Sequence, residues 1–181
     1  MSDLIIMLGD SLTAGNRWDR AFPRTKLRNL GINGDTCAGV WGRLDEVVSL
    51  KPGLIFLQIG INDFLRGAIP EELVTGHQRI WAELSQRRPE AALRVISLFP
   101  YLEEALPGLA PNLDLIETNQ RLAEEAAKAG LAFIDLFRAL ADPDHQLRLD
   151  YTTDGLHLTP AAYRVWEDRL RLEMENGPAA G

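Results

Sequence analysis

Serine, histidine and aspartate together can make a hydroxyl nucleophilic at neutral pH, and this chain carries them in two short motifs. The first, Gly9-Asp10-Ser11-Leu12, directly follows the apolar run Leu4–Leu8. It places the Ser11 hydroxyl where a buried strand should end and a helix should begin. The second, Asp154-Gly155-Leu156-His157, puts an acid shortly before a histidine near the other end of the chain. This pairing makes a hydrolase the leading hypothesis.

Each of the three side chains would have its own chemical role. Ser11 holds its proton too tightly to attack alone, so it needs a base. His157 can accept that proton and return it to a leaving alcohol. Asp154 would hold the other imidazole nitrogen, provided that residues 154–157 form a single turn. The alternatives are that Ser11 only caps a helix and that His157, between two leucines, is a packed core residue.

Apolar runs alternate with amphipathic segments along the chain, which indicates a parallel sheet covered by helices on both faces. The expected strands are Leu4–Leu8, Lys26–Leu30, Leu54–Ile59, Val95–Phe99 and Leu131–Leu136, and the expected helices are Gly39–Leu50, Pro70–Gln86, Leu113–Ala129 and Pro160–Glu175. Ligands of such folds bind beyond the carboxyl ends of the strands, which is where Ser11 and Asn62 fall. Leu102–Asn112 is predicted to be a long loop that could form a rim over the site.

Four motifs stand in order along the chain: Gly9-Asp10-Ser11-Leu12, Asn29-Leu30-Gly31-Ile32-Asn33-Gly34, Gly60-Ile61-Asn62-Asp63 and Asp154-Gly155-Leu156-His157. Together they resemble the SGNH hydrolase superfamily, also called the GDSL esterases and lipases, from Leu4 to about Tyr163. The segment from Ser11 to Asp63 is also similar to the acetylhydrolase-like branch. The resemblance maps the four residues that name the family onto Ser11, Gly34, Asn62 and His157.

The resemblance implies a fold and a domain organisation. The fold would be a three-layer α/β/α sandwich with a mostly parallel, roughly five-stranded sheet, flavodoxin-like in topology. One SGNH hydrolase domain would cover residues 1–176, followed by a flexible tail at residues 177–181.

An ester attacked by Ser11 would develop a negative oxygen, which needs hydrogen-bond donors fixed in advance. The candidates for this oxyanion hole are the backbone N–H groups of Ser11 and Gly34 and the side-chain amide of Asn62. Donors of this kind are worth about 3–4 kcal/mol each in related sites. The alternative reading of Asn62 is a turn residue, and that of Gly34 is a glycine that only punctuates its loop.

Apolar side chains near the motifs are candidates for the acyl pocket: Ile32, Phe64, Leu65, Pro100, Tyr101 and Leu156. Trp18 and Trp41 could stack on a sugar or aromatic alcohol, or could pack in the core. Asp10 and Asp63 are expected to order their loops by accepting hydrogen bonds from backbone N–H groups.

Composition excludes several classes of function. The 181 residues, 46% hydrophobic and 25% charged, are typical of one soluble globular domain, and a net charge of -7 argues against nucleic-acid binding. No stretch is apolar for the roughly 20 residues that membrane insertion requires, and no leader is apparent. Cys37 is the single cysteine, so no intramolecular disulfide can form. His77, His145 and His157 lack metal-ligand spacing, and the first two are expected at the solvated surface. No metal and no cofactor are expected.

The sequence therefore predicts a cytoplasmic serine carboxylic ester hydrolase. Its partner would be a small-molecule ester with a short acyl group, acetyl included, cleaved through an acyl-enzyme on Ser11. A thioesterase or lysophospholipase with the same residues is the alternative within enzymes. A binding module that kept the fold without turnover is the alternative from another class. Homo-oligomer formation is left open by the sequence.

Overall fold

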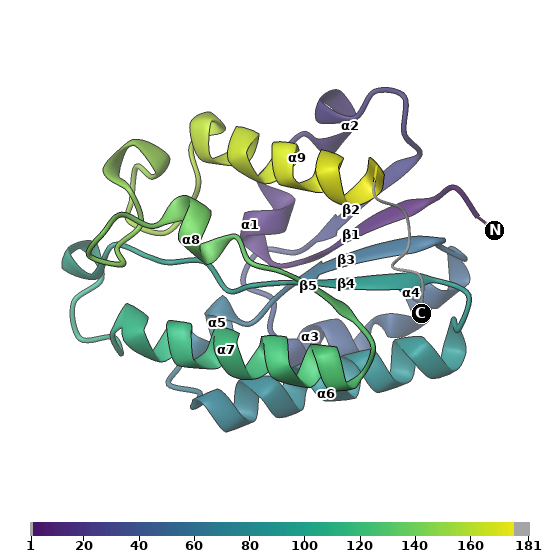
Figure 1. The fold of residues 1–181 in the computed structure, drawn as a ribbon, viewed down its shortest axis with the longest axis horizontal. Coiled ribbons are helices and arrows are strands. Elements are labelled where there is room, and N and C mark those ends of the chain that lie inside the picture. Colours follow the sequence, from purple (N-terminus) through teal and green to yellow (C-terminus); the bar gives the residue numbers. More distant parts are fainter. Residues whose placement is uncertain (1, 176–181) are drawn as a thin grey trace.

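The strands form one parallel sheet. The computed structural model describes residues 2–175, and within them five strands run in the order β2-β1-β3-β4-β5 (Figure 1). Their bounds are β1 Ile5–Gly9, β2 Leu27–Gly31, β3 Leu54–Gln58, β4 Ala92–Ile96 and β5 Ala132–Ile134. This confirms the α/β fold with a parallel five-stranded sheet. The tail predicted at residues 177–181 lies outside the described residues.

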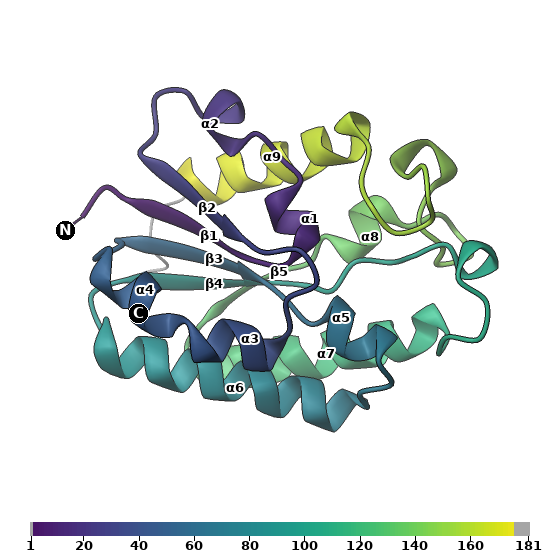
Figure 2. The ribbon, with the colours of Figure 1, turned by 180° about the vertical axis from the view of Figure 1, so that it is seen from behind.

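Helices cover both faces of the sheet, as Figures 1 and 2 show from opposite sides. One face carries α1 Ser11–Ala14, α2 Trp18–Ala21, α8 Phe137–Leu140 and α9 Pro160–Glu175. The other carries α3 Cys37–Gly42, α4 Leu44–Ser49, α5 Ile61–Leu65, α6 Pro70–Arg87 and α7 Asn112–Lys128. The 3-10 helices η1 Glu103–Ala105 and η2 Leu149–Tyr151 lie in the loops beyond the carboxyl ends of the strands. None of the helices described is long and apolar enough to cross a membrane.

The order of the strands places a crevice at the ends of β1 and β3. After β1 the chain moves outward to β2, and after β2 it crosses back to β3 on the other side of β1. Gly9, the last residue of β1, pairs with Gly31 of β2 and with Gln58 of β3, so the three strands end at one level. Such a reversal of direction is where open α/β sheets bind their ligands.

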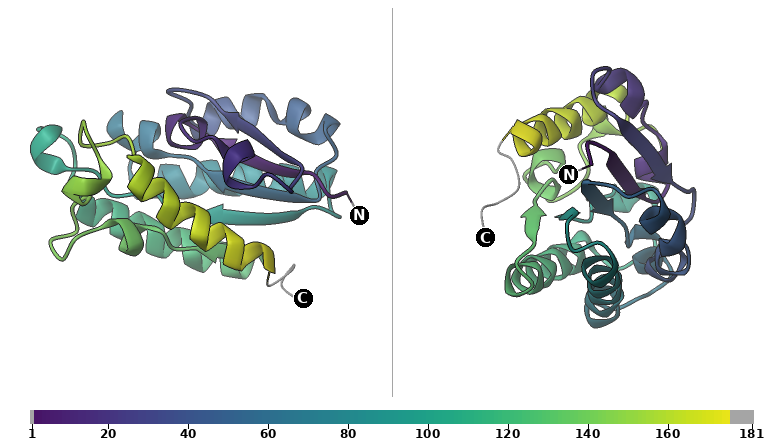
Figure 3. Two further views of the ribbon diagram at one scale, coloured as in Figure 1. Left: turned by 90° about the horizontal axis from the view of Figure 1, so that it is seen from above. Right: turned by 90° about the vertical axis from the view of Figure 1, so that its right-hand side faces the viewer.

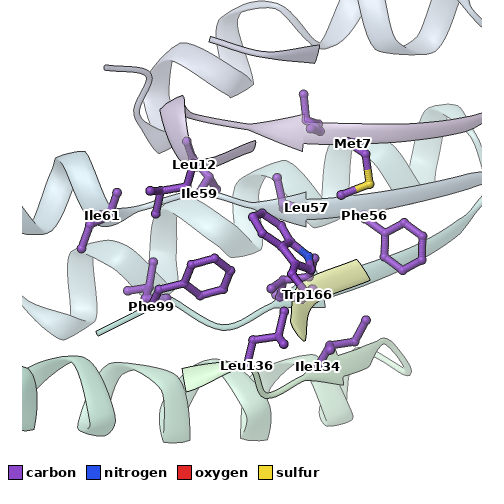
Figure 4. Packing of buried hydrophobic residues seen from close by; sticks show 14 of the residues in the cluster. Met7, Leu12, Phe56, Leu57, Ile59, Ile61, Phe99, Ile134, Leu136 and Trp166 are labelled. Carbon is purple, nitrogen blue, oxygen red and sulfur yellow. The ribbon is translucent and has the colours of Figure 1, made fainter. Parts of the chain in front are cut away.

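Trp166 anchors α9 to the sheet. Its indole is fully buried and packs edge-on against Trp18 (ring centroids 4.9 Å apart) and Phe99 (4.8 Å). Figure 4 shows this ring pointing from α9 toward apolar side chains of the sheet, and Figure 3 shows α9 and the pair α6–α7 as separate layers. Burying an aromatic side chain of this kind stabilises a fold by about 2–3 kcal/mol. The core reading of Trp18 is therefore the correct one.

Two predicted elements differ from the structure for local reasons. The single helix expected at Gly39–Leu50 is divided into α3 and α4, because Arg43 has non-helical dihedral angles (φ -115, ψ 17). The strand expected at Val95–Phe99 ends at Ile96. Beyond it, the Asn119 amide side chain bonds both the N–H and the C=O of Leu98, so these groups have left the sheet although the residue is buried.

The expectation that His77 is solvated is wrong. Its ring is fully buried on α6, and Nε2 lies 3.0 Å from the carbonyl oxygen of Ile59. Burial lowers the pKa of His77 to about 4, more than the bond to Ile59 raises it, so the ring is neutral at physiological pH. The polar residues next to it in sequence point away from the core on the outer face of the helix, which is why the sequence misled.

Candidate active site

Ser11, His157 and Asp154 form a continuous chain of hydrogen-bond contacts. The Ser11 Oγ lies 3.1 Å from His157 Nε2, and His157 Nδ1 lies 2.7 Å from Asp154 Oδ2. Ser11 is the first residue of α1 and half-buried, and Asp154 and His157 are each 51% exposed at their side chains. In this geometry the imidazole can take a proton from the hydroxyl while the carboxylate holds its other nitrogen.

Hydrogen bonds within the turn at residues 154–157 hold the side chains of Asp154 and His157 in place. Asp154 Oδ1 accepts the backbone N–H groups of Leu156 and His157 at 2.9 and 2.8 Å. The Thr152 hydroxyl donates to the His157 carbonyl at 2.9 Å and accepts the Gly155 N–H at 2.9 Å. Desolvation raises the pKa of Asp154, but the hydrogen bonds from the Leu156 and His157 N–H groups and from the imidazole outweigh it and lower the pKa to about 2. Asp154 is therefore ionised at neutral pH.

The turn before Ser11 is held by Asp10, not by the serine. Asp10 is the N-cap of α1, and its Oδ1 accepts the Leu12 N–H at 2.9 Å. The reading of Ser11 as a mere helix cap is thereby excluded. Gly31 on β2 lets α1 approach closely, since a Cβ there would lie 2.3 Å from the backbone nitrogen of Ala14.

The three candidate oxyanion donors come from three neighbouring loops. Asn62, in the first turn of α5 after β3, donates from Nδ2 to the Asp35 carbonyl at 2.9 Å, and an amide nitrogen has a second N–H to offer. Gly34 has φ of +75, a conformation that strains other residues, and a Cβ on it would enter open space. Asp63 accepts the Cys37 N–H at 3.0 Å. Asp10 and Asp63 thus order their loops as predicted.

The residues expected to line the acyl pocket fall into two groups. Phe64, Pro100 and Tyr101 are buried, and the Tyr101 hydroxyl donates to the Ala110 carbonyl, so these three present no open surface to a substrate. Ile32 is 48% exposed beside Gly34, whereas Leu65 and Leu156 are half-buried. Substrate contact by this second group stays a prediction.

The predicted rim loop and Trp41 lie at the surface around the site. Leu102, at the start of the predicted rim loop, donates its N–H to the Gly155 carbonyl at 2.7 Å, which places this loop against the turn at residues 154–157. Trp41 is 44% exposed with the Arg79 guanidinium 4.7 Å from its ring centroid. Contact between Trp41 and a substrate alcohol stays a prediction.

Three residues that the sequence analysis did not identify contact the loops of the site. Arg43 pairs with Asp35 through a 2.7 Å contact, Arg66 donates from Nη2 to the Gly34 carbonyl at 3.2 Å, and Thr152 holds the His157 turn. A threonine two residues before an aspartate is a recognisable turn signal. The arginines carry no such signal, since an arginine between apolar helical residues usually faces solvent.

The chain matches the sequence profile of the GDSL-like Lipase/Acylhydrolase family over residues 7–165. It is 26% identical over 170 residues to an N-acylneuraminate cytidylyltransferase of Streptococcus agalactiae serotype V, covering 94% of this chain and 38% of that protein. It is also 29% identical over 109 residues to thioesterase 1/protease 1/lysophospholipase L1 of Escherichia coli K12, covering 54% of this chain and 52% of the relative. The chain thus spans only part of the curated relatives that it matches.

Solved structures show the same fold. A provisionally named platelet activating factor from Streptococcus pneumonia superposes with a TM-score of 0.84 at 25% identity, over 95% of this chain and 83% of that one. A psychrotrophic esterase from Pseudoalteromonas, inhibited by monoethylphosphonate in its structure, superposes with a TM-score of 0.73 at 18% identity, over 97% and 98% of the two chains. Since the family profile covers most of its length, this chain belongs to the GDSL-like lipase/acylhydrolase family.

Proposed function

We propose that this chain is a serine carboxylic ester hydrolase that works through an acyl-enzyme on Ser11. The observation that carries the proposal is the contact chain from Ser11 Oγ to His157 Nε2 (3.1 Å) and from His157 Nδ1 to Asp154 Oδ2 (2.7 Å). It brings together residues that are 146 positions apart in the sequence, which is hard to explain as local structure alone.

The proposed reaction has two matching halves. His157 Nε2 takes the Ser11 proton as Oγ attacks the ester carbonyl, and the oxyanion accepts hydrogen bonds from the N–H groups of Ser11 and Gly34 and from Asn62 Nδ2. The imidazolium then gives its proton to the departing alcohol, which leaves an acyl group on Ser11. Water, deprotonated by His157, attacks this ester, and the acid is released as the serine regains its proton.

The openness of the site supports small acyl groups, acetyl among them. The side chains of Asp154 and His157 are half exposed. Phe64 and Tyr101, whose ring centroids lie 6.3 Å apart, are buried and offer no open apolar surface for a longer chain. A long acyl chain would need an apolar groove of its own next to the serine.

Thioester or lysophospholipid cleavage is the second candidate. The same nucleophile, base and donors serve both bonds, and the Escherichia coli relative named thioesterase 1/protease 1/lysophospholipase L1 supports this alternative. The exposed Ile32 and the half-buried Leu65 and Leu156 would then contact the longer chain.

Hydrolysis of p-nitrophenyl esters from acetate to palmitate tests the proposal, with Ser11→Ala as the inactive variant. Ser49→Ala is the control, because within residues 2–175 its exposed hydroxyl only donates to the Glu46 carbonyl at the end of α4. We expect serine-dependent activity that peaks at two to four carbons. A peak at eight or more would favour the thioesterase or lysophospholipase alternative. No hydrolysis at any length would overturn the proposal in favour of a binding module.

A further inference from the structure

A largely buried ion pair touches two of the three loops that meet at the candidate site. Arg43 Nη2 and Nε lie 2.7 and 2.9 Å from Asp35 Oδ2, and Nη2 also donates to the Gly9 carbonyl at 3.1 Å. The two side chains are 16% and 9% exposed. The guanidinium therefore joins the end of β1, just before Ser11, to the loop that follows Gly34.

Asp35 extends this connection to the third loop. Its backbone carbonyl accepts Asn62 Nδ2 at 2.9 Å, while its Oδ1 accepts the Thr36 N–H at 2.9 Å. Asp63, the neighbour of Asn62, accepts the Cys37 N–H at 3.0 Å. The loops that carry Ser11, Gly34 and Asn62 are thus tied in series, and Arg43 makes the link at the nucleophile.

The break between α3 and α4 belongs to the same arrangement. Arg43 follows Gly42 with φ -115 and ψ 17, and its own N–H still bonds the carbonyls of Val40 and Trp41. The chain turns at this residue, and the side chain returns to the strand ends instead of facing solvent.

We propose that Arg43, acting through Asp35 and the Gly9 carbonyl, is a positioning residue that fixes the spacing of the three oxyanion donors. This inference rests on the proposed function. Donors stabilise a developing charge only if they are held in place beforehand, and a misplacement of about 1 Å can lower the rate about a hundredfold. Arginine suits the task because its planar guanidinium holds Nε and Nη2 in fixed positions against the Asp35 carboxylate and the Gly9 carbonyl, whereas a lysine ammonium is a single nitrogen without this fixed geometry.

The test compares Arg43→Met and Arg43→Lys with the wild-type chain on the best short ester, well below the Tm of each variant. We expect Arg43→Met to lower kcat about tenfold to a hundredfold with KM within about twofold, because the donors act on the transition state. Lysine should recover less than half of that loss on a logarithmic scale. Full recovery by lysine would show that charge alone matters and would overturn the inference.

Arg88→Met is the matched control. Arg88 has a side chain that is 14% exposed, pairs with Glu90 at 2.6 Å and donates to the Pro52 carbonyl, near the amino ends of β3 and β4 and so at the opposite end of the strands from Ser11. Its loss should lower Tm without lowering kcat. If Arg43→Met behaves in the same way, with a lower Tm and an unchanged kcat, Arg43 is purely structural and the inference fails.

A double-mutant cycle with Asp35→Asn tests whether the pair acts as one unit. We expect Asp35→Asn to lower kcat as well, and the double variant to lose little more than the worse single variant. Multiplied losses would contradict the link through Asp35. Should Arg43→Met fail to fold, Asp35→Asn, which keeps the side-chain shape, takes over the kcat test. An inactive wild type would contradict the proposed function, whereas an active wild type with unaffected variants would contradict this inference alone.

Discussion

Asp10 precedes Ser11 in the sequence, and Asp154 is connected to it through His157. The surroundings of these two carboxylates shift their pKa values in opposite directions. Asp154 is half exposed, and its Oδ1 accepts two backbone N–H groups while Oδ2 meets the imidazole, so its pKa falls to about 2. Asp10 is fully buried and accepts only the Leu12 N–H, and Oδ2 has no partner within residues 2–175. Burial therefore raises the pKa of Asp10 to about 7, despite that bond, and the charges of Asp35 and Asp63 add to the rise.

This difference in pKa supports the different roles that we propose for the two aspartates. A carboxylate that stays ionised beside an imidazole can stabilise the imidazolium that forms during proton transfer. A carboxyl group buried next to other acids is poorly suited to that task, because its charged form is already unfavourable. Asp10 is next to Ser11 in the sequence, yet Asp154 is the better candidate to hold the imidazole, because the hydrogen bonds of its turn keep it ionised.

The largest effect should come from Asp154→Asn. The amide no longer offers a charged acceptor to His157 Nδ1 and favours the wrong tautomer, so we expect kcat to fall about 10⁴-fold, as in other serine triads. Asp150→Asn is the matched control, because Asp150 is exposed in the same region and pairs only with Arg148 among the charged groups. Equal losses in both variants, measured by ester hydrolysis, would show that Asp154 has no special role.

A smaller loss of activity is expected for Asn62→Ala. Its comparison with Asn119→Ala contrasts an amide proposed to act on the substrate with an amide that supports the fold. Loss of an oxyanion donor should lower kcat about 10²–10³-fold with little change in KM. Tm should fall by less than in Asn119→Ala, because a single carbonyl, that of Asp35, loses its partner. Asn119→Ala should do the reverse, because it strips the buried N–H and C=O of Leu98 of partners at 2.8 and 3.0 Å. That costs about 1–3 kcal/mol of unfolding free energy for each group. An equal rise in KM for Asn62→Ala would mean that it binds the ground state.

Asp10→Asn should change stability more than activity. The amide oxygen still accepts the Leu12 N–H, and no charge remains to be buried. Because the folded pKa of about 7 lies above the unfolded value of 3.8, the native state holds a proton that the unfolded state has released, and wild-type stability falls as pH rises from about 4 to 7. The variant should lack this fall, so its Tm advantage should grow from pH 5 to pH 8. A constant difference in Tm would contradict the buried, proton-holding state.

The pH dependence of Asp154 should have the opposite sign and a smaller size. Its folded pKa of about 2 lies below the unfolded value of 3.8, so its contribution is complete above pH 4 and is lost as pH falls toward 2. Solvent screening of a half-exposed pair limits this contribution to less than about 1 kcal/mol. The unfolding free energies of Asp154→Asn and the wild type, measured by denaturant titration, should converge near pH 2. A difference in unfolding free energy that persists there would contradict this contribution of Asp154.

The sequence predicted best those features that depend on a short segment of chain, such as a strand end or a single turn. Ser11 at the end of a strand and Asp154 with His157 on one turn follow from motif spacing, because a short turn leaves few ways to arrange its side chains. The parallel sheet follows from uninterrupted apolar runs such as Leu54–Ile59. These features depend on local sequence or on simple patterns of burial.

Features that depend on long-range contacts could not be predicted. The helix break at Arg43 reflects its bonds to Asp35 and Gly9, and the early end of β4 reflects the amide of Asn119. His77 was mistaken for a surface residue because its neighbours in sequence are polar. In each case a deciding partner lies outside the element itself, from eight residues away for Asp35 to 34 for Gly9, and hydrophobic periodicity carries no record of such contacts.

The most direct test of the proposed nucleophile is covalent labelling with an organophosphonate, followed by mass mapping of the labelled peptide. We predict one adduct, on Ser11, that is absent from Ser11→Ala, forms far more slowly in Asp154→Asn and forms at the wild-type rate in Asp150→Asn. An adduct on another residue, or ester hydrolysis that survives in Ser11→Ala, would contradict the assignment of Ser11 as the nucleophile.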